Sequence, residues 1–95
     1  MTTWTGGNAN LRRTNYIGGN IVQKTYSITG IAGDTGGTLT CQGLKLLKDH
    51  VTNVYTAAGG VDAANSYISG NTVIVTYANP AAGHTVRITV WGLKA

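Results

Sequence analysis

Apolar and polar residues alternate along most of the chain after residue 20, which is the pattern of β-strands with one buried face. In the segment IVQKTYSIT, residues 21–29, the even-numbered positions from Val22 to Ile28 share one face, and β-branched residues are frequent. In TVRITVW, residues 85–91, Val86, Ile88 and Val90 alternate with Arg87, Thr89 and Trp91. Both segments therefore predict strands.

Two turns divide the last third of the chain. Gly70-Asn71 joins the β-rich segments NSYIS and TVIVTYA, which predicts a hairpin with a tight primed turn. Asn79 to Gly83 predicts a second turn, because Pro80 fixes φ. We expect a three-strand meander in which 72–78 and 85–91 are adjacent antiparallel strands. The core residues expected on these two strands are Val73, Val75, Val86, Ile88 and Val90.

The middle of the chain is harder to interpret. Its glycine-rich stretch from Gly30 to Gly37 predicts a loop, since glycine at this density favours positive φ. Strand-favouring residues occupy 38–43 and 50–56, and we expect strands there. Between them, Leu44 to Lys48 fits either a strand or a single helical turn, and its spacing leaves the two open.

The first twenty residues mix Gly, Asn and Thr with isolated apolar residues and keep no period for long. One interpretation is an extended arm, 1–20, preceding a single β domain, 21–95. The other is a short edge strand near 11–17. The fold class that we predict is all-β, a small antiparallel β-sandwich or partly closed barrel with an N-terminal arm.

With 95 residues and no Phe, the chain has a modest core, and its lone Cys41 excludes an internal disulfide. Oligomerisation or docking on a larger body is the favoured source of additional stability. The opening residues lack the pattern of a secretory leader, and no apolar run approaches the ~20 residues of a membrane span. We expect no membrane association.

The chain has a net charge of +4, from seven Lys or Arg and three Asp. Arg12-Arg13 is the only adjacent pair, and the other cations are scattered. Nucleic-acid binding is disfavoured because it needs clustered cations that neutralise several phosphates. Diffuse attraction to an acidic protein surface fits this charge distribution better.

The residues that could carry chemistry are few. Cys41, His50 and Asp49 could form a nucleophile and its base, but neighbours on a strand point to opposite faces, so Asp49 would not orient His50. His84 is expected in a solvent-facing loop, and Cys41 is expected as a small buried residue. No metal-ligand spacing or phosphate-loop motif is present, so we expect no catalysis, metal or cofactor.

Three segments resemble short β-rich virion proteins of tailed bacteriophages, among them head decoration or cement proteins. They are ITGIAGDTGGTL from Ile28, SGNTVIVTYANPAAGHT from Ser69, and the terminal Val90-Trp91-Gly92. The resemblance covers roughly residues 20–95. It implies a protein made in the host cytoplasm and placed on the capsid surface of the virion. Its implied partners are the major capsid protein and its own copies, with a homotrimer favoured.

A capsid decoration protein that stabilises the phage head is therefore the expected function. We expect its interface on the arm, at Trp4, Leu11, Arg12, Arg13 and Tyr16. The alternative is a receptor- or glycan-binding module of a tail fibre or tail tip, which would need a solvent-facing aromatic patch. A third is a basic barrel that binds single-stranded nucleic acid, with aromatics and cations interleaved on one face.

Overall fold

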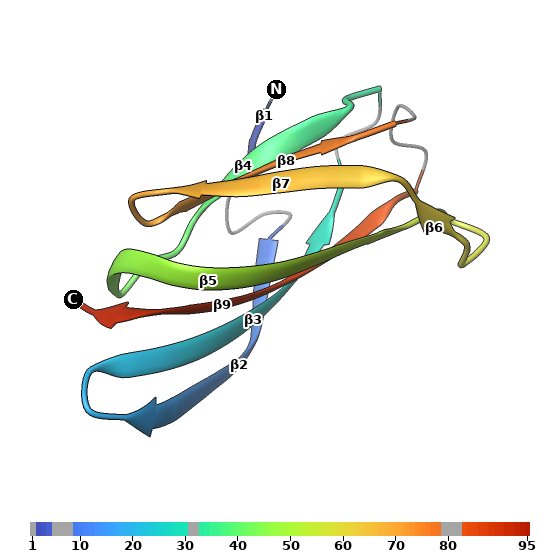
Figure 1. The fold of residues 1–95 in the computed structure, drawn as a ribbon. Coiled ribbons are helices and arrows are strands. Elements are labelled where there is room, and N and C mark those ends of the chain that lie inside the picture. The colour runs from blue at the N-terminus through green and yellow to red at the C-terminus, as the bar shows by residue number, and fades with distance from the viewer. Residues whose placement is uncertain (1, 5–8, 31–32, 79–82) are drawn as a thin grey trace.

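The computed structural model describes residues 2–4, 9–30, 33–78 and 83–95, which form two β-sheets packed face to face (Figure 1). This confirms the prediction of an all-β sandwich. Every strand pairing in it is antiparallel except that of β1 with β4. The strands are β1 (Thr2–Trp4), β2 (Ala9–Gly18), β3 (Ile21–Thr29), β4 (Gly36–Thr40), β5 (Leu44–Tyr55), β6 (Val61–Asp62), β7 (Ala64–Ser69), β8 (Thr72–Tyr77) and β9 (Thr85–Lys94).

Sheet A has the order β1-β4-β8-β7, and sheet B has the order β2-β3-β9-β5-β6. The two sheets approach each other along β5 and β7, whereas β2 and β3 lie on the far flank of sheet B (Figure 1). The core between them is made of the inward residues of both sheets. It includes all five predicted core residues, Val73, Val75, Val86, Ile88 and Val90, each fully buried.

The predicted meander is wrong in its last step. The β7–β8 hairpin forms as expected, with Ser69 opposite Thr72, but β8 continues to β4 in sheet A. Strand β9 lies between β3 and β5 in sheet B, so the chain crosses from one sheet to the other after β8. Both strands thereby gain neighbours on each side and bury one apolar face in the shared core. Their alternation of residues is the same in either arrangement, so it could not reveal the partner strands.

Two hairpins are closed by the same dipeptide. Gly19-Asn20 joins β2 to β3, and Gly70-Asn71 joins β7 to β8. Gly19 and Gly70 have φ values of 58° and 61°, and no non-glycine residue described has a positive φ. In a type II′ turn only the first of the two loop residues has positive φ, and that residue is usually glycine. Both turns fit this type. The predicted Gly70-Asn71 turn is confirmed.

Residues 44–48, which fitted either a strand or a helical turn, are the beginning of β5. The register of β5 against β9 shifts between Leu44 and Leu46 and again between Leu47 and Asp49. Each β-bulge inserts one extra residue, so Leu44 and Leu47 both reach the core although they are three positions apart. Two bulges in a strand therefore produced a spacing that resembles a helix.

The start of the chain belongs to the sandwich. Strand β1 pairs with β4, and β2 pairs with β3 along nearly its whole length. Of the two interpretations of this segment, the structure supports the edge strand for residues 9–18, and not an extended arm. The predicted glycine loop also ends earlier than expected, because Gly36 and Gly37 are already in β4.

Candidate docking surface at the edge of sheet B

Strand β2 forms the open edge of sheet B. It pairs with β3 on one side, and no other described strand pairs with its outer side. Its register against β3 shifts between Leu11 and Arg13 and between Tyr16 and Gly18, which identifies β-bulges at Arg12 and Ile17. The regular part of the edge is therefore residues 13–16, with exposed backbone groups facing solvent.

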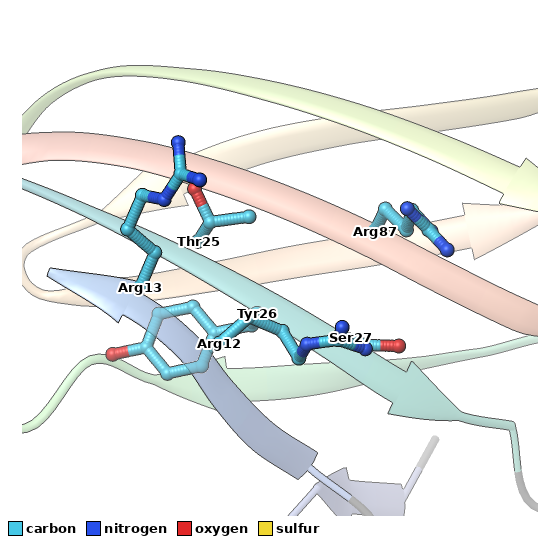
Figure 2. A pocket seen from close by; sticks show the side chains of 6 residues that line it. All are labelled: Arg12, Arg13, Thr25, Tyr26, Ser27 and Arg87. Carbon is cyan, nitrogen blue, oxygen red and sulfur yellow. The ribbon is translucent and has the colours of Figure 1, made fainter.

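The outer face of sheet B carries a cationic hollow of about 200 Å³ next to β2. Its lining residues are Arg12, Arg13, Thr25, Tyr26, Ser27 and Arg87. Figure 2 shows Arg13 extending toward Thr25 and Arg12 toward Ser27, while Arg87 comes from β9. Arg87 is the register partner of Ser27, which is how a residue 74 positions beyond Arg13 reaches the same hollow.

The hollow is electrostatically one-sided. None of its lining residues is acidic, and within the described part of the chain no salt bridge is formed by any of these three arginines. Its floor offers the hydroxyls of Thr25 and Ser27, which can donate as well as accept hydrogen bonds. Three guanidinium groups above such a floor are suited to carboxylate or another planar oxyanion, which arginine binds with two parallel hydrogen bonds.

The inner side of β2 is apolar and only partly covered. Leu11 is 49 % exposed and Tyr16 is 75 % exposed, although both lie on the face that leads into the core. Tyr16 borders a second hollow, of about 380 Å³, together with Val22 and Lys24. The ammonium of Lys24 donates a hydrogen bond of 2.6 Å to the Gln42 carbonyl. Leu11 lines a hollow of about 440 Å³ whose other side is formed by residues of sheet A, among them Trp4 and Leu39, whereas no residue of a sheet A strand lines the hollow at Tyr16. Strand β2 therefore has one cationic face and one largely apolar face.

The structure separates the five predicted interface residues. It brings Arg12 and Arg13 together at one hollow and leaves Leu11 and Tyr16 exposed on the opposite face. Trp4 differs from the expectation, because its side chain is 2 % exposed and belongs to the core of the sandwich. Arg87 was not singled out from the sequence. The alternation in 85–91 predicts that Arg87 points outward, but the sequence does not reveal the strand order that places β9 near β2.

The candidate catalytic residues are not assembled into a site. Cys41 is fully buried, as predicted, and burial raises the pKa of its thiol to about 11 although Tyr26 and Lys24 act in the opposite direction. His50 shares a hydrogen bond of 2.8 Å with the Ser66 hydroxyl, a pairing that links β5 to β7. The Asp49 carboxylate accepts from the His50 backbone N–H instead of orienting the imidazole. The absence of catalysis stays a prediction.

The expectation for His84 is wrong. His84 is 4 % exposed, its Nε2 lies 3.2 Å from the Asp62 carboxylate, and its ring stacks on Tyr77 with centroids 5.3 Å apart. The ring is buried because it packs against Tyr77 of β8 and Asp62 of β6. The cluster joins β6 and β8 to the residue that precedes β9.

The described residues contain no group of three or more side chains suited to a metal ion. Nor do they contain a helix that could span a membrane. Comparison of the chain with models of protein families, with curated proteins and with solved structures finds no match.

Proposed function

We propose that this protein is a virion structural protein that docks on the capsid of a tailed bacteriophage and stabilises the head as a decoration or cement protein. The observation that supports this most is the hollow formed by Arg12, Arg13 and Arg87 beside the open edge of β2. A surface of this kind is suited to a protein partner with exposed carboxylates. The resemblance of residues 20–95 to virion proteins supplies the viral context.

The energetics of a small module favour such a role. A weak contact repeated on a symmetric shell gains avidity when the protein is itself oligomeric, and a homotrimer remains the favoured assembly. A hydrogen bond to a charged group contributes about 1.5 to 3 kcal/mol when it is shielded from water. Two or three arginines therefore suffice for a specific contact without a large apolar interface.

The alternative is a receptor- or glycan-binding module of a tail fibre or tail tip. A sugar platform needs aromatic rings gathered on one exposed surface. The most exposed tyrosines are Tyr16 on β2 and Tyr67 on β7, which lie at opposite flanks and in different sheets. Tyr26, the aromatic residue that lines the arginine hollow, is buried, which also disfavours base stacking by single-stranded nucleic acid. Capsid docking is thus the better supported proposal.

The test is co-sedimentation of the purified protein with particles of the phage that encodes it, stripped of the protein. We expect saturable binding that is stoichiometric with the coat protein and that weakens as salt rises. Arg13→Glu and Arg87→Glu should each lower particle affinity by about tenfold or more.

The matched control is Lys45→Glu, which makes the same charge change at an exposed residue on another part of sheet B. It should leave particle binding within about twofold of wild type. Absence of the protein from intact particles, or equal losses for all three variants, would contradict capsid docking through this surface. Sedimentation equilibrium of the free protein gives the oligomeric state.

A further inference from the structure

Strand β2 keeps a short regular edge between its two bulges. Between its two bulges, residues 13–16 keep regular register with β3, from Arg13 opposite Thr25 to Tyr16 opposite Val22. The backbone groups on the far side of these residues are those that an added strand would pair with. Four residues give a short ladder, so side chains must supply part of the affinity.

The two faces of β2 dictate what the side chains of an added strand must be. Residues directly opposite each other in a pair of strands point to the same face. Partners of Arg13 and Asn15 would therefore lie on the outer face, beside the arginine hollow. Partners of Thr14 and Tyr16 would lie on the inner face, beside Val22 and the aliphatic stem of Lys24.

A second copy of β2 does not meet these requirements. Strand β2 carries two arginines and no acidic residue. In face-matched antiparallel pairings centred on Arg13 or Thr14, the two Arg13 side chains would lie opposite or diagonal, within about 8 Å of each other on one face. Like charges so placed are destabilising. The arginines thus disfavour self-pairing in these registers and favour a strand of opposite charge.

The edge formed by β7 gives no such selection. Strand β7 is the edge of sheet A on the other flank, and its sequence, ANSYIS, has no charged residue. The β2 edge differs in joining unpaired backbone to a hollow with three guanidinium groups and no carboxylate.

We propose that β2 binds an extended segment of its protein partner by strand addition, and that this segment alternates acidic with apolar residues. The acidic side chains occupy the hollow of Arg12, Arg13 and Arg87, and the apolar ones cover Tyr16 and Leu11. This inference rests on the proposed docking function and gives the chemistry of the partner. It places the binding energy in both backbone pairing and carboxylate recognition.

The probe is a synthetic seven-residue peptide, capped at both ends, with valine and glutamate alternating. Binding is measured by NMR titration of the whole protein, together with amide hydrogen exchange. We expect the alternating peptide to bind and to slow exchange at those β2 amides that face solvent in the free protein. An isomer with its glutamates in one block should bind about tenfold more weakly or worse, because it cannot place acids on one face only.

Charge reversal supplies a rescue. Arg13→Glu should weaken binding of the glutamate peptide by about tenfold or more. Because Arg12 and Arg87 keep the hollow positive in that variant, only the triple variant with Glu at positions 12, 13 and 87 should bind the same peptide with lysine in place of glutamate. Tyr16→Ala should weaken both peptides in their matching hosts, whereas Lys45→Glu should change neither.

Equal affinity for the alternating and blocked isomers would overturn strand addition, and so would binding without protection of β2 amides. Particle docking that depends on Arg13 would then leave the proposed function intact. Peptide binding by a protein that does not dock on particles would give the reverse result, with strand addition supported and the capsid role refuted.

Discussion

The indole ring of Trp4 lies so close to Gly37 that a β-carbon at position 37 would overlap the Cε2, Cζ2 and Nε1 atoms of the ring. Trp4 is the last residue of β1, and Gly37 is near the start of β4, the strand with which β1 pairs. The absent side chain of the glycine leaves the space that the indole fills. Residues 2–4 are held to sheet A by this contact and by the parallel β1–β4 pairing.

Gly37→Ala should therefore destabilise the fold. The added methyl group must displace a buried ring or the backbone of β4, which costs about 1 to 3 kcal/mol in a well-packed core. Trp4→Ala should cost about 3 to 5 kcal/mol. Urea denaturation followed by far-ultraviolet circular dichroism measures both costs.

The matched control for Gly37 is Gly60→Ala. A β-carbon at Gly60 would meet only the Thr56 hydroxyl at 3.6 Å, an ordinary contact. We expect a change within about 0.5 kcal/mol of zero. A Gly37→Ala variant as stable as this control would mean that Trp4 does not pack on β4.

Deletion of residues 1–10 should likewise destabilise the domain, since it removes Trp4.

Ile88→Ala should lower the free energy of unfolding by about 2 to 5 kcal/mol, because the side chain is fully buried between the sheets. Val51→Ala is the control at a half-exposed position of the neighbouring strand, and it should cost less than about 1 kcal/mol. Chemical denaturation of both variants measures the difference. Similar small costs at the two sites would contradict the assignment of faces on β9.

Stability should fall as the solution becomes alkaline. The thiol of Cys41 has a pKa of about 11 in the folded protein, above the roughly 8.5 of an unfolded chain. Below pH 8.5 the thiol is protonated in both the folded and the unfolded protein, and its full contribution to the free energy of unfolding is present. Between about pH 8.5 and 11 the unfolded state loses its proton first, so of the order of 2 to 3 kcal/mol is lost.

Cys41→Ala should flatten this part of the stability profile, whatever its cost at pH 7. Burial also raises the pKa of Tyr26 and Tyr77, so both variant and wild type should keep a decline above pH 10. Urea midpoints measured from pH 7 to 11 give the two slopes. Identical slopes for wild type and Cys41→Ala would show that the thiol does not titrate differently on unfolding.

Engineered disulfides can separate the two possible positions of β9. Thr25 and Thr89 are register partners whose hydroxyl oxygens lie 3.4 Å apart, so Thr25→Cys with Thr89→Cys should oxidise readily in a Cys41→Ala background. The control pair, Thr76→Cys with Arg87→Cys, would be adjacent if β8 paired with β9. In the sandwich it lies on the outer faces of different sheets and should stay reduced. Thiol titration and mass spectrometry distinguish the results.

The sequence by itself determined the class of fold and much of the core. Alternation along 21–29 and 85–91 identifies strands and their buried faces, because side chains in a strand alternate with period two whatever the neighbours are. The Gly70-Asn71 turn was equally local, since it depends on the φ that glycine allows.

Only the tertiary structure decided which strands are neighbours. The placement of β9 between β3 and β5, the bulge that brings Leu44 and Leu47 to one face, and the pairing of His84 with Asp62 all depend on contacts between residues distant in sequence. The hollow is the clearest case, since Arg87 joins Arg12 and Arg13 only through the order β2-β3-β9. A strand's own alternation is compatible with many partners, and the choice is made by the combined burial of all the apolar faces at once.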